Sequence, residues 1–137
     1  MKHVYSSKMA VRWGDMDAYQ HVNNTVYFRY MEQIRVEWME SVKKSTDTEV
    51  TLDGTGPVLI NTQCTFLRQL KYPDHIEVQM FAGSPGRSSF ETSYAIYRLN
   101  PDETTTLCAE GTAKIVWVNY QAEKSIPLPK EVLAQLA

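Results

Sequence analysis

One segment restricts the fold of this chain more than any other: a single long stripe of apolar residues at helical spacing. Within residues 25–42 the apolar side chains recur at steps of four, three, four and four residues, and charged or amide side chains fill the opposite side. This pattern predicts an amphipathic helix about 27 Å long. Either Asn23 or Asn24 is suited to be its N-cap, since an Asn side-chain oxygen accepts a backbone N–H of the first turn. The stripe consists of Tyr27, Met31, Ile34, Trp38 and Val42.

The remainder of the chain shows the two-residue period of β-strands. Before the helix, residues 9–13 alternate, which predicts a strand with Met9, Val11 and Trp13 on its buried face. After Pro57 four further runs alternate in the same way. Their predicted inward residues are Ile60, Cys64 and Phe66 in the first, Ile76, Val78 and Met80 in the second, Phe90, Tyr94 and Ile96 in the third, and Ile115 and Trp117 in the fourth.

Turn sequences at residues 71–74, 83–86 and 100–103 separate these runs, so we expect consecutive strands to be antiparallel neighbours. One short helical turn is predicted at residues 130–136. A single helix can bury its apolar stripe here only if a curved antiparallel sheet of about five strands wraps around it. The sequence therefore predicts an α+β fold, with residues 1–137 forming one domain.

Composition narrows the classes of partner. Fourteen Lys+Arg against 16 Asp+Glu leave a net charge of -2, so we expect neither nucleic acid nor an anionic membrane as partner. No run of about 18 apolar residues predicts a membrane span, and the polar start of the chain does not resemble a signal peptide, which favours the cytoplasm. Cys64 and Cys108 are interpreted as packing thiols. The three histidines are isolated in the sequence, so no metal site is predicted.

The segment that packing does not explain is the polar loop between the first strand and the helix, WGDMDAYQHVNNTVY at residues 13–27. Functional groups often gather in such loops. This segment resembles the signature of the hot-dog-fold acyl-CoA thioesterases of the 4-hydroxybenzoyl-CoA thioesterase type: an aromatic residue, D-x-D, a short loop and H-V-N-N-x-x-Y. The order of strand, helix and four strands agrees with that family over essentially the whole chain.

The resemblance implies a hot-dog fold, with a long central helix wrapped by a curved antiparallel sheet. It also implies a homodimer joined edge to edge, alone or as a dimer of dimers (a homotetramer), that hydrolyses acyl-CoA at the subunit interface without a metal or redox cofactor. By the same resemblance, Asp17 is the nucleophile or general base and Asp15 is structural. A backbone N–H near Asn24, at the start of the helix, takes the place of the oxyanion donor.

Elementary chemistry agrees with this assignment. Thioester hydrolysis places negative charge on the carbonyl oxygen, and the N–H groups at a helix start are unpaired and lie at the positive end of the helix dipole. A carboxylate beside them can attack the carbonyl or remove a proton from water. The alternative for Asp15 and Asp17 is an Asx-type turn or capping contact. Crowding of these two acids with Glu32 would raise the pKa of a carboxyl group among them.

Other polar residues have two interpretations each. His21 is either a second acid/base group or a residue that organises the loop, and Asn23 is either a cap or a substrate contact. Tyr27 and Tyr30 fit the core or the lining of an acyl pocket. Arg87 and Ser88, in a turn where family members place basic or polar residues, are candidates for contacts with CoA, with a solvated turn as the alternative.

Two other functions compete with acyl-CoA hydrolysis. A non-catalytic dimer could bind acyl-CoA or acyl carrier protein in the same groove without turnover. A dehydratase or hydratase of the same fold would use a histidine and an acid in a different motif, which this sequence lacks.

Overall fold

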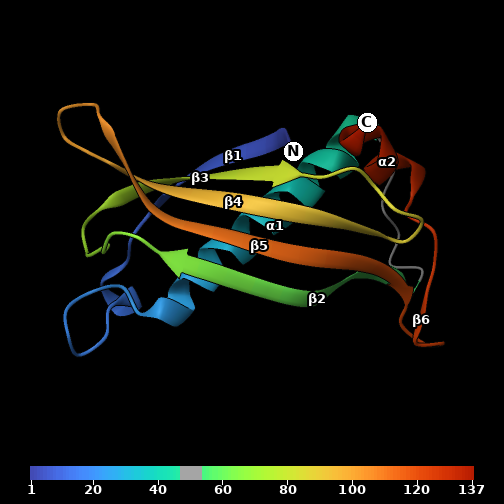
Figure 1. Cartoon of the computed structure of the whole chain (residues 1–137), viewed down its shortest axis with the longest axis horizontal. Helices are drawn as coiled ribbons and strands as arrows, with labels where there is room; N and C mark the ends of the chain where they lie inside the picture. The colour runs from blue at the N-terminus through green and yellow to red at the C-terminus, as the bar shows by residue number, and fades with distance from the viewer. Residues whose placement is uncertain (47–53) are drawn as a thin grey trace.

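The computed structural model describes residues 1–46 and 54–137 (Figure 1). The chain order is strand, long helix, four long strands, one very short strand and a terminal helix. In order, the elements are β1 (Lys2–Ala10), the 3-10 turn η1 (Trp13–Asp15), α1 (Asn24–Thr46), β2 (Thr55–Phe66), β3 (His75–Ala82), β4 (Ser89–Leu99), β5 (Thr105–Asn119), β6 (Lys124–Ser125) and α2 (Lys130–Leu136).

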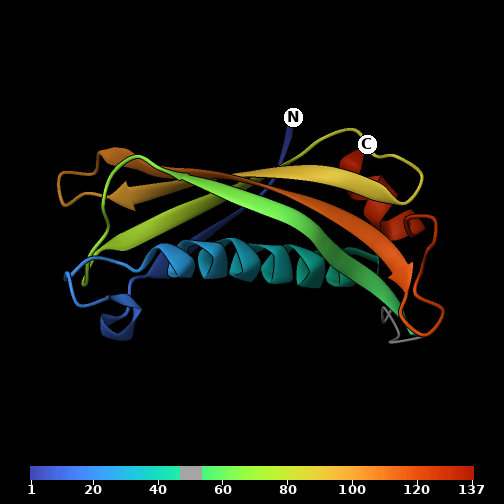
Figure 2. The same cartoon turned by 60° about the horizontal axis from the view of Figure 1, so that its bottom comes forward.

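The strands form one antiparallel sheet in the order β1-β3-β4-β5-β2, with β6 paired to β5. The sheet curves over α1, which lies along its concave face (Figure 2). The predicted α+β class and the hot-dog arrangement are therefore confirmed. The terminal helix α2 has the bounds that the sequence predicted, and it packs on α1 and β1.

The core lies between α1 and the inner face of the sheet. All five residues of the predicted helix stripe are buried, with Met31 and Ile34 fully inaccessible. The Trp38 ring meets the Phe90 ring edge-on, with centroids 5.8 Å apart. At Gly111 the helix comes so close to β5 that a Cβ atom would overlap the sulfur of Met31. The stripe thus holds the helix against the sheet through side-chain packing.

Helix α1 is longer than the predicted 18 residues and extends to Thr46. The apolar pattern ends at Val42, whereas the helical backbone continues through four further, polar residues. The segment that follows the helix, residues 47–53, lies outside the described residues. Asn23 is the N-cap, since its Oδ1 accepts the backbone N–H of Thr25 at 3.0 Å.

The first strand lies earlier than predicted. Residues Lys2–Ala10 form β1, whereas Trp13 belongs to η1 and is 74% exposed, so its placement in the core was wrong. As an edge strand, β1 has few apolar residues to mark it, and the alternation at residues 9–13 spans its end and the following turn.

Two expectations about β2 were also wrong. Strands β2 and β3 are not neighbours, because β2 pairs with β5 at the far edge of the sheet and the chain crosses over through residues 67–74. A turn sequence marks a reversal of direction but not which strands pair. The predicted inward residues Ile60 and Phe66 are 55% and 46% exposed, since β2 is an edge strand that α1 covers only in part.

The remaining expectations concern the other tryptophans, the cysteines and membrane-spanning segments. Trp38 and Trp117 are buried, as predicted. Both cysteines are free thiols; burial raises the pKa of Cys64 to about 11 and raises that of Cys108. Among the described residues, no helix is long and apolar enough to cross a membrane.

Candidate active site

The polar loop is held in a defined shape by its own backbone. Met16 and Val22 form an isolated antiparallel bridge that closes a tight turn between them. Inside it, the backbone N–H of Asp17 donates to the carbonyl of His21 and that of Gln20 donates to the carbonyl of Asp17, each at 3.0 Å. Gln20 adopts a left-handed backbone with φ of 64° to complete the turn. These bonds fix the position of Asp17 relative to the helix start.

The Asp17 side chain both supports this turn and remains available for chemistry. Its Oδ1 accepts the backbone N–H of Tyr19 at 2.8 Å, which is the Asx-type turn considered from the sequence. Its Oδ2 has no hydrogen-bond partner among the described residues. One oxygen therefore orients the carboxylate while the other can face a substrate.

The start of α1 offers a backbone donor to the same region. The Asn23 side chain and carbonyl accept the N–H groups of Thr25 and Val26, at 3.0 and 2.9 Å. The Asn24 N–H has no acceptor within the described part of the chain. As the first amide of a 23-residue helix, it lies at the positive end of the helix dipole. Such a donor is suited to an oxyanion.

These groups meet at one open cavity of about 650 Å³, which we call the Asp17 hollow. The polar loop forms one wall of this hollow, and the segment after β2 forms the opposite wall. The backbone N–H of Val22 connects the two by donating to the carbonyl of Leu70 at 2.8 Å. The structure thus brings Asp17, His21, Asn24 and Tyr27 together. The full lining is Asp17, Tyr19, His21, Val22, Asn24, Tyr27, Phe66, Leu67, Arg68 and Gln69.

Asp15, the first acid of D-x-D, has a structural environment. Its Oδ2 accepts the Tyr30 hydroxyl at 2.8 Å and the Arg12 backbone N–H at 2.9 Å. Burial, followed by the bond to this carboxylate, raises the pKa of Tyr30 far above its usual value. Asp15 thereby anchors the loop on α1, as the sequence indicated.

Tyr27 fits both predicted roles, as a core residue and as part of the lining of a substrate pocket. It is 4% exposed and meets the Phe66 ring edge-on at 4.9 Å, yet it forms part of the wall of the Asp17 hollow. Burial raises its pKa, so it remains a neutral phenol.

Two predicted contacts lie elsewhere in the chain. Arg87 and Ser88 belong to the turn between β3 and β4, at the opposite end of the sheet from the loop (Figure 2). Their carbonyls accept the backbone N–H groups of Leu128 and Trp117. Within one chain they cannot reach the Asp17 hollow. The Asn23 side chain is also engaged at the helix start instead of lining the hollow.

Several residues of the hollow were not predicted. Phe66, Leu67, Arg68 and Gln69 come from the end of β2 and the segment after it, about 40 residues from the motif, and only the sheet topology brings them close. Tyr19 lies inside the motif, but the sequence did not show that its side chain is 83% exposed and lines the hollow. No group of His, Cys, Asp and Glu suited to a metal ion occurs among the residues described.

Comparison with known proteins identifies the family of this chain. A family model described as the thioesterase-like superfamily matches residues 11–136, nearly the whole chain. The chain belongs to the thioesterase-like superfamily. The resemblance found in the sequence is confirmed, and the chain is a thioester hydrolase by family.

Individual relatives show the same likeness. A solved structure of a candidate thioesterase from Pseudomonas aeruginosa is 33% identical, with a TM-score of 0.87 over 99% of this chain and 100% of that one. A candidate esterase from Aquifex aeolicus is 29% identical over 92% of each chain. A 4-hydroxybenzoyl-CoA thioesterase mutant complexed with 4-hydroxybenzoyl-CoA is 16% identical, with a TM-score of 0.83 over 97% and 98% of the chains, and this likeness concerns the fold.

Proposed function

We propose that this protein is an acyl-CoA thioesterase that hydrolyses its substrate to a free carboxylic acid and CoA. The observation that supports this most directly is the placement of the Asp17 carboxylate and the unpaired Asn24 N–H at one hollow. A solved structure from Xanthomonas campestris that is 31% identical over 86% of this chain is described as a candidate acyl-CoA thioesterase, which favours a CoA ester as substrate. A cytoplasmic location fits the two free thiols.

In this mechanism the thioester carbonyl accepts the Asn24 N–H, which stabilises the negative charge that develops on its oxygen. Asp17 Oδ2 then acts in one of two ways. It attacks the carbonyl carbon, releasing CoA thiolate and leaving an anhydride that water hydrolyses, or it takes a proton from a water that attacks instead. His21, in the same turn, supports the loop or exchanges protons. CoA thiolate is a good leaving group, so neither route requires a metal.

The first test is release of CoA thiol from short, medium, long and aromatic acyl-CoAs by the wild-type protein. We expect turnover of at least one member. Tight binding without turnover would favour the non-catalytic binding module, and water addition to a crotonyl thioester would favour a hydratase. Either result would contradict the thioesterase assignment.

We further propose a homodimer joined through the β2 edge. This edge exposes Leu59, Ile60 and Phe66, whereas the other edge, β1, bears Lys2 and Lys8, and lysines on an edge strand oppose pairing. An antiparallel β2–β2 pair would place the sheet end with Arg87 and Ser88 in one copy alongside the Asp17 hollow of the other. Both residues then remain candidates for contacts with CoA, and dimers could associate further into a tetramer.

Sedimentation tests the dimer. We expect wild-type protein to sediment as a dimer or a dimer of dimers at micromolar concentration. Ile60→Lys should shift it to monomer, because a charge replaces an apolar side chain in the proposed dimer interface. The matched control is Lys8→Glu on the β1 edge, which should leave assembly unchanged. A wild-type monomer at every concentration would contradict the proposal.

A further inference from the structure

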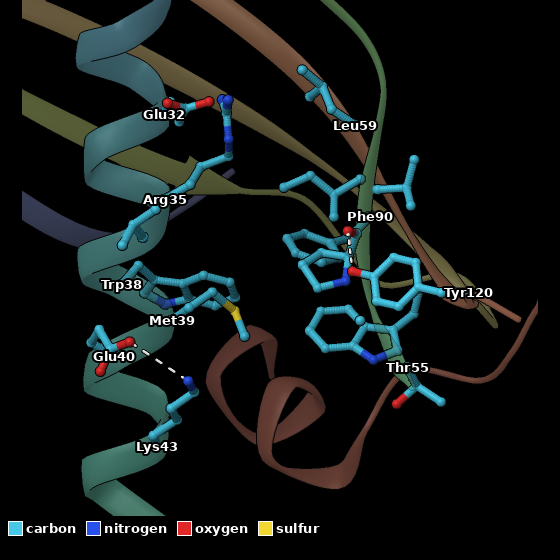
Figure 3. Close-up of a pocket in the computed structure, with 16 residues that line it drawn as sticks. Glu32, Arg35, Trp38, Met39, Glu40, Lys43, Thr55, Leu59, Phe90 and Tyr120 are labelled. Atoms are coloured by element: carbon cyan, nitrogen blue, oxygen red, sulfur yellow. Dashed lines mark hydrogen bonds and ion pairs between the residues drawn. The ribbon is translucent and has the colours of Figure 1, made fainter. Parts of the chain in front are cut away.

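A second cavity of about 410 Å³ lies between the second half of α1 and strands β2 and β5, and we call it the α1–β2 pocket (Figure 3). Trp38 and Met39 form its helix side, facing Phe90 and Tyr120 across the opening. Most of its wall is apolar or aromatic. It shares no lining residue with the Asp17 hollow among the residues described. Nothing in the proposed mechanism uses this space.

Two cations line this apolar space, Arg35 and Lys43, and the fold holds Arg35 in place. The Arg35 guanidinium lies over the Tyr94 ring, 5.6 Å from its centroid, and its Nη1 donates to the Tyr94 hydroxyl at 3.3 Å. Tyr94 and Thr92 are buried, and their hydroxyl oxygens are 2.7 Å apart. Thr92 Oγ1 donates its only hydrogen to the carbonyl of Ala113 at 3.0 Å.

The direction of these hydrogen bonds follows from the single hydrogen that each hydroxyl group carries. Because Thr92 has used its hydrogen, the Tyr94 hydroxyl must donate to Thr92. The oxygen of Tyr94 can then only accept, and it accepts from Arg35. This chain of hydrogen bonds positions the guanidinium, and within the described part of the chain it satisfies one of the Arg35 N–H groups. The other donors are left for another acceptor.

No described carboxylate lies within ion-pair distance of Arg35. Glu40, also on the wall, pairs with Lys43 at 3.6 Å. Glu32 is exposed at the rim, one helical turn before Arg35 (Figure 3). A half-buried guanidinium without a carboxylate partner, at the wall of an aromatic pocket, is complementary to an anion with an apolar body.

We infer that the α1–β2 pocket binds an organic acid: its aliphatic or aromatic body lies against Trp38, Met39 and Tyr120, and its carboxylate accepts hydrogen bonds from Arg35. Such a ligand has two sources. It is either a free carboxylic acid or the far carboxyl end of an acyl group. The second source rests on the proposed function, because it needs the thioester to lie in the Asp17 hollow of a second copy joined through β2.

Calorimetric titration of the assembled protein tests the site without reference to catalysis. We expect octanoate to bind at least about tenfold more tightly than octanamide, because hydrogen bonds to a charged partner are the stronger ones. Arg35→Met should abolish this preference, while Glu32→Gln, which removes the competing negative charge at the rim, should preserve or increase it. Equal binding of acid and amide by wild-type protein, or an unchanged preference in Arg35→Met, would overturn the inference.

If Arg35→Met does not fold, Tyr94→Phe provides the second variant. It keeps the ring under the guanidinium and removes only the oxygen that accepts from Arg35, so the preference for octanoate should weaken. A preference unchanged in Tyr94→Phe would then count against the inference.

Hydrolysis assays distinguish the two sources of the ligand, a free carboxylic acid and the carboxyl end of an acyl group. If acyl tails enter the pocket, kcat/KM should be higher for adipoyl-CoA than for hexanoyl-CoA, and Arg35→Met should remove that preference. If only free acids enter, octanoate binds but the two esters are treated alike. Should no ester be hydrolysed, the proposed function fails while the octanoate titration still decides the pocket.

Discussion

Replacing Asp17 with asparagine is expected to lower kcat on the best acyl-CoA substrate by about 10²–10⁴-fold, the usual contribution of a positioned acid or base. The amide has no negative charge with which to attack a carbonyl or to accept a proton from water. Its oxygen can still accept the Tyr19 N–H in place of Oδ1, so the turn should keep its shape. Release of CoA thiol under saturating substrate measures the change.

Two further variants separate chemistry from loop structure. Asp17→Ala loses both the charge and the bond to Tyr19, so it should be at least as inactive and slightly less stable. Asp15→Asn weakens the acceptor for the Tyr30 hydroxyl, so its main effect should be on stability. Wild-type turnover by folded Asp17→Asn would show that Asp17 is not the catalytic acid/base or nucleophile.

Replacing Trp38 with alanine is expected to lower the free energy of unfolding by about 3–5 kcal/mol, as for other buried aromatic residues truncated to alanine. Trp38 is 1% exposed, lies in the middle of the α1 stripe and packs edge-on against Phe90. Its loss opens a cavity between the helix and the sheet and enlarges the α1–β2 pocket. Urea unfolding followed by circular dichroism measures the change in midpoint and slope.

The control is Trp38→Phe, because the indole N–H of Trp38 has no hydrogen-bond partner in residues 1–46 and 54–137. Phenylalanine keeps a ring against Phe90 and removes this unsatisfied donor, so it should cost well under half as much as alanine. An alanine variant as stable as wild type would mean that the helix does not depend on this contact.

Much of the fold was determined by local patterns. The apolar stripe from Tyr27 to Val42 predicted α1, since a helix presents one face to the core at a fixed period. The bounds of α2 were predicted correctly, because Pro127 and Pro129 end the preceding segment. The motif at residues 13–27 brought Asp17, His21 and Asn24 to one hollow, since all three lie within one short loop and the helix start that follows it.

The tertiary structure alone decided what depends on distant contacts. Turn residues could not show that β2 pairs with β5 and not with β3, because strand pairing depends on non-local hydrogen bonds and on which faces can be buried together. That pairing brings Phe66 and Arg68 to the Asp17 hollow and leaves Ile60 exposed. The turn between β3 and β4, which contains Arg87, lies at the other end of the sheet. Sequence determines local shape through short-range sterics and periodicity, whereas the neighbours of a side chain are fixed only when the whole sheet closes over its helix.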